Sequence, residues 1–130
     1  MDNKKVLFFV EDENEIIELY STQLETNGYS VEGFNSGGEA LAKINSIVEG
    51  KFSPPAVIIL DLLLKDISGL AILGELMDKP MFDETFIIVL TNYVSESLEK
   101  SVMRLDNVVY LSKVDTTPVS LAELIKRKVV

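Results

Sequence analysis

Three short runs of this sequence are almost entirely apolar, and they constrain the fold more than any other feature. The runs are KVLFFV at residues 5–10, AVIIL at 56–60 and TFIIVL at 85–90. A strand that is covered on both faces has this continuous apolar pattern, which is typical of parallel sheets. Two weaker strands are predicted at 29–34 (YSVEGF), whose alternation fits an edge of the sheet, and at 107–111 (NVVYL).

Segments with helical periodicity separate these strands. They cover residues 13–27, 36–48, 68–78 and 95–105, and a last helix opens at Thr117-Pro118. In the third of these helices we expect Leu70, Leu73 and Met77 to face the core. Five strands that alternate with five helices predict an α/β fold, in which a doubly wound parallel sheet carries helices on both faces. We expect a single domain over residues 1–130.

The composition excludes several kinds of chemistry. The chain has no Cys and no His, which excludes disulfides, thiolate catalysis, Cys-based zinc sites, imidazole metal ligands and a histidine phosphate carrier. The net charge of −9 disfavours direct nucleic-acid binding and favours a cation or a partner with a basic patch. No apolar run is long enough to span a bilayer or to form a signal peptide, so we expect a cytoplasmic protein.

Polar side chains follow the apolar runs at the points where the predicted strands end. They are Glu11 and Asp12 after the first strand, Asp61 after the third, Thr91 after the fourth and Ser112-Lys113 after the fifth. The carboxyl ends of parallel strands share one edge, where ligands bind in open α/β sheets, so we expect these side chains to converge. Asp61 is either a solvated turn residue or a charge that a partner stabilises, because a buried, unpaired carboxylate is costly.

Three carboxylates beside one lysine repel one another, and a hard divalent cation would relieve this repulsion. Mg²⁺ prefers oxygen ligands and often takes one or two carboxylates together with water and phosphate. A hydroxyl and an ammonium group, here Thr91 and Lys113, suit a phosphate. Alone, each residue fits an ordinary role such as a helix cap or a surface charge. Their shared placement instead indicates that Asp61 is a metal-bound carboxylate that can attack phosphorus.

Five motifs, in order, make the sequence resemble the receiver domain of two-component response regulators over nearly its whole length. VEDE at residues 10–13 resembles the acidic pair after the first strand, and GGEAL at 37–41 the start of the second helix. ILDLLLKDISG at 59–69 resembles the phosphoacceptor segment. VLTN at 89–92 and YLSK at 110–113 resemble the ends of the last two strands. This family has a flavodoxin-like (βα)5 fold with strand order 2-1-3-4-5.

The resemblance implies a phosphorylation-dependent signalling switch with aspartyl phosphate chemistry. Asp61 would accept a phosphoryl group from a phosphohistidine, carried by a sensor histidine kinase or by a histidine phosphotransfer protein. Mg²⁺ would be bound by Asp12 and Asp61, by Glu11 through water, and by the backbone carbonyl of Leu63. Turnover would be limited to autophosphorylation and slow autodephosphorylation, so we do not expect an enzyme.

The resemblance also implies how the phosphoryl group would be sensed. Lys113 would pair with the phosphoryl oxygens, and Thr91 would hydrogen-bond them and draw its loop inward. Tyr110 would then swing inward and alter the surface formed by the helix at 95–105, the last strand and the last helix. A downstream protein, or a second copy in a homodimer, is the partner expected at this surface.

Three positions depart from the family's usual pattern. Lys65 stands where the family usually has proline, four residues after the acceptor, and Val114 replaces the proline after the lysine. A cis bond before a non-proline residue costs about 2.5–4 kcal/mol, so a trans Lys113–Val114 bond, with a differently shaped loop, becomes an alternative. Asn92 replaces a usually small residue and is expected to crowd the route of small phosphodonors.

Three other functions are alternatives to a phosphorylated receiver. A degenerate receiver would be a protein-interaction module that is never phosphorylated, although the set of acidic residues, threonine and lysine is intact. A haloacid dehalogenase-type phosphatase needs its aspartate after the first strand and a second aspartate two residues later, where this chain has Leu63. A flavin or nucleotide binder lacks a phosphate-cradling loop. If the chain is complete, we expect a stand-alone receiver that acts by protein contact.

Overall fold

The computed structural model describes residues 3–93 and 95–129, which form a five-stranded parallel sheet in the order β2-β1-β3-β4-β5. The strands are β1 (Val6–Val10), β2 (Ser30–Phe34), β3 (Val57–Leu60), β4 (Phe86–Thr91) and β5 (Val108–Ser112). The helices are α1 (Asn14–Thr26), α2 (Gly37–Val48), α3 (Gly69–Met77), the 3₁₀ turn η1 (Pro80–Phe82), α4 (Glu96–Met103) and α5 (Pro118–Lys128). The predicted fold class and strand order are therefore confirmed.

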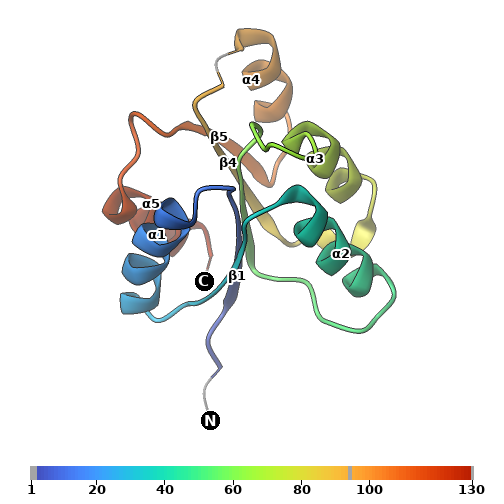
Figure 1. Cartoon of the computed structure of the whole chain (residues 1–130), viewed down its shortest axis with the longest axis horizontal. Coiled ribbons are helices and arrows are strands. Elements are labelled where there is room, and N and C mark those ends of the chain that lie inside the picture. Colours follow the sequence, from blue (N-terminus) through green and yellow to red (C-terminus); the bar gives the residue numbers. More distant parts are fainter. Residues whose placement is uncertain (1–2, 94, 130) are drawn as a thin grey trace.

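Helices cover both faces of the sheet, with α1 and α5 on one face and α2 and α3 on the other (Figure 1). The central strand β3 explains this arrangement, because all four of its residues are buried. Val57 and Ile59 point into the core beneath α1 and α5, whereas Ile58 and Leu60 point into the core beneath α2 and α3. A strand that is apolar on both faces requires cover on both sides, as the sequence predicted.

Short polar residues fix where four of the helices begin. The side chains of Ser36, Ser68, Ser95 and Thr117 each accept an N–H group from the first turn of the helix that follows. These caps satisfy donors that have no partner within the helix, so each helix starts at a defined residue beyond its strand. None of the helices in the described part of the chain is long and apolar enough to cross a membrane.

Two local details differ from the expectations. Leu70 was expected to face the core, but 43% of it is exposed, and Ile72 and Leu76 are buried instead, together with Leu73. Leu70 lies in the first turn of α3, on the side of the helix that faces away from the sheet. The 3₁₀ turn η1 was not predicted, although it places Phe82 in the core.

Candidate functional site

The carboxyl ends of the strands bring the predicted polar residues to one edge of the sheet. Leu60 lies beside Val10 on one side and beside Val89 on the other. Glu11 and Asp61, which directly follow β1 and β3, therefore leave neighbouring strands at the same level. At the end of β4 and β5, Thr91 lies beside Ser112, so Lys113 follows at the same edge.

Lys113 lies between two buried carboxylates. Its Nζ donates a hydrogen bond to Oδ2 of Asp61 at 2.7 Å and lies 2.5 Å from Oε1 of Glu11. The contact with Glu11 is an ion pair that lacks aligned hydrogen-bond geometry. Asp61 is 3% exposed and Glu11 is 0% exposed. Asp61 is therefore not a solvated turn residue, and its charge is stabilised by the lysine.

Burial and charge have opposite effects on these three groups. Burial raises the pKa of Glu11, and the lysine and the Glu13 N–H group offset only part of this effect. Burial acts to lower the pKa of Lys113, but the close contacts with the charged carboxylates of Asp61 and Glu11 outweigh it and raise that pKa. Two buried carboxylates share a single ammonium group, so the triplet is one positive charge short. Such a deficit favours a bound cation.

Glu11, which contacts Lys113, also belongs to a cluster of acidic residues that follows β1. One carboxylate oxygen from each of Glu11, Asp12 and Glu13 lies within 4.8 Å of the others. Glu13, which is exposed, was not among the predicted ligands. Carboxylate oxygens are the donors that hard divalent cations prefer, so this donor set and the missing positive charge together fit Mg²⁺. The roles of Asp61 and the Leu63 carbonyl as ligands stay predictions.

Comparison with known proteins identifies the family. The family model of the response regulator receiver domain matches residues 7–127 of the chain. The chain belongs to this family. It is 31% identical over 123 residues to the acid tolerance regulatory protein ActR of Rhizobium meliloti (strain 1021), covering 95% of this chain and 59% of ActR. The receiver is thus a domain of two-component signalling.

Further comparisons agree with this assignment. The receiver is 28% identical to the transcriptional regulatory protein TrcR of Mycobacterium tuberculosis (strain ATCC 25618 / H37Rv), over 93% of this chain and 42% of TrcR. The chain spans about half the length of these curated relatives. The crystal structure of the CheY-like receiver domain protein from Methanospirillum hungatei JF-1 has a TM-score of 0.77 and 27% identity, covering 97% of this chain and 94% of that chain.

The β3–α3 loop of the receiver orients Asp61. The N–H group of Leu63 donates to Oδ1 of Asp61 at 3.0 Å, while Oδ2 pairs with Lys113, so both oxygens have a defined direction. At the far end of the loop, a Cβ on Gly69 would lie 2.3 Å from the carbonyl oxygen of Asp61. Only glycine permits this close approach, which explains the Gly eight positions after the aspartate.

Thr91 and Tyr110 meet at a third residue, Tyr93. The buried hydroxyl of Thr91 accepts the N–H group of Tyr93 at 3.1 Å, and the hydroxyl of the half-buried Tyr110 donates to the Tyr93 carbonyl. In the part of the chain that the structure describes, neither side chain forms a hydrogen bond with Asp61. The structure therefore brings Lys113 against Asp61, and it joins Thr91 and Tyr110 to one another through the β4–α4 loop.

The β5–α5 loop lacks the proline that is usual in the family, and hydrogen bonds hold it instead. No cis peptide bond occurs among the described residues, so the Lys113–Val114 bond is trans. The Ser112 hydroxyl accepts a hydrogen bond from the Val114 N–H group at 3.3 Å, and the Ser112 carbonyl accepts one from the Thr116 hydroxyl at 2.7 Å. The Tyr20 hydroxyl of α1 donates to the Thr116 carbonyl at 3.1 Å.

The sequence did not predict the bond between the Tyr20 hydroxyl and the Thr116 carbonyl. The signal was present, because a buried tyrosine hydroxyl usually finds a partner. The sequence does not reveal which carbonyl accepts it, since the acceptor lies 96 residues away along the chain.

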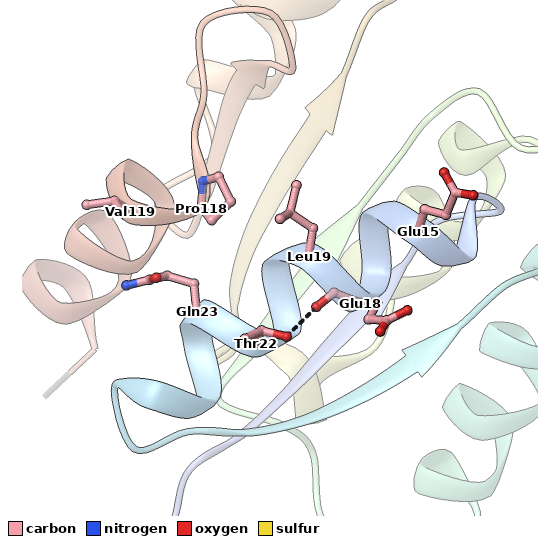
Figure 2. Close-up of a pocket in the computed structure, with 7 residues that line it drawn as sticks. All are labelled: Glu15, Glu18, Leu19, Thr22, Gln23, Pro118 and Val119. Carbon is pink, nitrogen blue, oxygen red and sulfur yellow. Dashed lines mark hydrogen bonds between the residues drawn. The ribbon is translucent and has the colours of Figure 1, made fainter.

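An open groove of about 540 Å³ runs between α1 and α5 of the receiver (Figure 2). Leu19 and Val119 present apolar side chains here, 59% and 52% exposed, and Glu15 and Glu18 add acidic ones. A smaller hollow, lined by Ile16, Tyr20, Asn92, Lys113 and Val114, lies on the same side of the sheet. Since Ile16 and Tyr20 are also α1 residues, the face that carries the groove extends to the lysine of the site.

Proposed function

We propose that this receiver accepts a phosphoryl group on Asp61 from a phosphohistidine, and that it acts as a switch and not as an enzyme. The phosphohistidine would belong to a sensor histidine kinase or a histidine phosphotransfer protein, since receivers of response regulators work with such kinases and with downstream targets. The observation that carries the proposal is the buried Asp61 carboxylate, paired with Lys113 beside an acidic cluster. The phosphorylation-independent alternative is not favoured by any contact at this site.

The proposed transfer is a displacement at phosphorus. An oxygen of Asp61 forms a bond to the phosphorus atom while the phosphorus–nitrogen bond of the phosphohistidine breaks, and the imidazole nitrogen keeps the electron pair. Phosphoryl transfer depends mainly on positioning and on charge stabilisation. The Leu63 N–H group orients the nucleophile, and the Lys113 ammonium lies 2.7 Å from its other oxygen, where it can pair with the incoming phosphoryl oxygens.

The residues that would hold Mg²⁺ are Asp12, Asp61, the Leu63 carbonyl and, through water, Glu11. The positive charge missing from the Lys113 triplet supports a cation at this position. When bound, Mg²⁺ neutralises negative charge on the carboxylates and on the phosphoryl oxygens. The protein side chains would still set the direction of attack.

The contacts of Tyr93 suggest how the switch would work. The Thr91 hydroxyl accepts the Tyr93 N–H group, so its own hydrogen can be donated to a phosphoryl oxygen on Asp61. If Thr91 moves inward, Tyr93 follows it. The Tyr93 carbonyl then moves away from the Tyr110 hydroxyl, and the hydrogen bond between them breaks. This would change the surface of α4, β5 and α5, where we propose that a downstream protein or a second copy binds.

We propose that the phosphohistidine-bearing partner docks on the groove between α1 and α5. Its exposed apolar side chains, Leu19 and Val119, offer contact area (Figure 2). Helix α1 leads from the groove to the hollow beside Lys113, because Ile16 and Tyr20 of α1 line that hollow. The acidic Glu15 and Glu18 favour a partner with basic residues around its histidine.

Nuclear magnetic resonance of backbone amides, with Mg²⁺ and then beryllofluoride added, tests this proposal. Mg²⁺ alone should shift the amides of residues 11–13 and 61–65, because the proposed ligands lie there. Beryllofluoride, which mimics a phosphoryl group on a carboxylate, should then shift Thr91 and Lys113, followed by Tyr93 and Tyr110.

The matched control is Asp61→Asn, which should bind no beryllofluoride while it keeps the fold. A wild-type spectrum that does not respond to Mg²⁺ and beryllofluoride would contradict the proposal and would favour a module that only binds proteins.

A further inference from the structure

The β3–α3 loop, which spans residues 61–68, is tied to two neighbouring parts of the molecule. On one side, the N–H group of Lys65 donates to Oδ2 of Asp12 at 3.2 Å. On the other side, the carboxylate of Asp66 accepts the N–H groups of Gly37 and Gly38, at 2.9 Å each. Two adjacent loop residues thus connect the segment after β1 to the start of α2.

Asp66 anchors the loop to α2. Its two oxygens accept N–H groups of the first helical turn, which have no acceptor within the helix. The bonds from Gly38 and Gly37 lower the pKa of Asp66, so the group is ionised at neutral pH. A Cβ on Gly37 would lie 2.9 Å from the Cβ of Ile67, which shows how closely the loop and the helix approach.

Lys65 acts through its main chain. Its backbone N–H group reaches Asp12, and the residue itself is exposed. Proline, which the family usually has at this position, has no N–H group and could not form this bond. The departure from the family pattern therefore supplies a donor that the usual residue lacks.

Asp12 is a half-exposed carboxylate on the segment between β1 and α1. A carboxylate on such a segment can adopt several side-chain rotamers, and a charge-assisted hydrogen bond favours one of them. The bond from Lys65 engages Oδ2, and a carboxylate has a second oxygen that can face a cation. The bond therefore restricts the direction in which Asp12 presents its ligand oxygen.

We propose that Lys65 and Asp66 are positioning residues for the metal ligand Asp12. Asp66 fixes the loop against α2, and the Lys65 amide, held in place by this anchor, orients the Asp12 carboxylate. The inference rests on the proposed function, because it takes Asp12 as a ligand of Mg²⁺. Partners that orient metal ligands in this way typically change metal affinity about 10–100-fold when they are removed.

Two substitutions at one position test the inference, with Mg²⁺ itself as the probe. Lys65→Pro removes the N–H group and should weaken Mg²⁺ binding about tenfold in calorimetric titration. Lys65→Ala keeps the N–H group and should bind Mg²⁺ as the wild type does. The carboxyl carbon resonance of Asp12 should shift in Lys65→Pro and stay in place in Lys65→Ala, which a general loss of stability would not produce.

Asp66→Ala removes the anchor without introducing proline, and it should also weaken Mg²⁺ binding. The inference is overturned if Lys65→Pro and Asp66→Ala both bind Mg²⁺ with wild-type affinity, while the metal site itself would then stand. If Lys65→Pro does not fold, Asp66→Ala alone provides the test, and wild-type Mg²⁺ affinity of that variant overturns the inference. A wild-type protein that binds no Mg²⁺ would remove the proposed site, and the inference with it.

Discussion

The β3–α3 and β5–α5 loops flank β4 and carry the two partners of the central ion pair, but they are held by different chemistry. The first carries Asp61, and carboxylates accept its key bonds, namely those of Leu63 to Asp61, Lys65 to Asp12 and the α2 amides to Asp66. The second carries Lys113, and apart from the contacts of the lysine with Asp61 and Glu11, the side-chain hydrogen bonds of this loop involve the hydroxyl groups of Ser112, Thr116 and Tyr20.

We infer from this difference that the first loop can change its bonding more readily than the second. Carboxylates change their bonding when they are protonated or bind a cation, whereas hydroxyl groups stay neutral over the same conditions. We therefore propose that the β3–α3 loop, called the acceptor loop below, responds to metal and phosphoryl groups, and that the β5–α5 loop, called the lysine loop, keeps its shape. Both loops lack the proline usual in the family, so hydrogen bonds define their shape.

Gly69→Ala should have the largest effect of the substitutions that distinguish the two loops, because its Cβ would clash with the backbone of the acceptor loop. The new Cβ would lie 2.3 Å from the Asp61 carbonyl oxygen and 2.5 Å from Leu62 Cα, both backbone atoms that cannot move aside cheaply. We expect a loss of about 2–3 kcal/mol in the free energy of unfolding, measured by urea denaturation.

Gly74→Ala is the matched control in the same helix. Apart from its chain neighbours and the backbone of its own helix, no atom lies within 4 Å of a Cβ at Gly74, so alanine should stabilise the protein by about 0.5–1 kcal/mol. Equal effects at the two glycines would show that the close approach at Gly69 does not constrain the acceptor loop.

Tyr20→Phe should have an intermediate effect, on the lysine loop. The ring can stay in its edge-on contact with Phe9, but the hydroxyl bond to the Thr116 carbonyl is lost. We expect a loss of about 1 kcal/mol in the free energy of unfolding and faster amide exchange at residues 113–116.

Tyr29→Phe provides the control for this change, because Tyr29 lies in the same core but away from this loop. If both variants left exchange at residues 113–116 unaltered, the lysine loop would not depend on the bond from α1.

The smallest expected effect is a response to acidic pH, which should occur in the acceptor loop and not in the lysine loop. Because the pKa of Asp66 is lowered in the folded protein, its contribution to stability is present above the ordinary carboxyl pKa of about 3.9 and is lost as pH falls through the lower value. The amide proton resonances of Gly37 and Gly38 should shift in that acidic range. Burial raises the pKa of Tyr20, so its bond should be indifferent to the same pH change.

Asp66→Asn should abolish the shift of the two glycine amides, since asparagine does not titrate. If the amide resonance of Thr116 shifted over the same acidic pH range while the protein stayed folded, the proposed difference between the two loops would be wrong.

The fold could be predicted from the sequence because its strands are continuously apolar and its helices periodic. These patterns, with the five motifs, lead to the observed sheet and to Glu11, Asp61 and Lys113 at one edge of it. The edge placement follows from topology alone, since parallel strands end on the same side.

The supports of the site could not be predicted in this way. The bonds from Lys65 to Asp12, from Gly37 to Asp66 and from Tyr20 to Thr116 join residues 53, 29 and 96 positions apart, and they depend on how loops fold over one another. The face of α3 was also misjudged at Leu70, because a short helix rich in apolar residues has more than one face that could be buried. Local patterns do not resolve such choices.

The role of Asp61 as the phosphoryl acceptor can be measured as the mass of the intact protein after incubation with Mg²⁺ and phosphoramidate, whose phosphorus–nitrogen bond resembles that of phosphohistidine. The incubation is long and the donor is in excess, because Asn92 is expected to slow the entry of small phosphodonors. We expect the wild-type chain to gain one phosphoryl group and Asp61→Asn to gain none under the same conditions. Full labelling of Asp61→Asn would show that Asp61 is not the acceptor, because the phosphoryl group would then reside on another side chain.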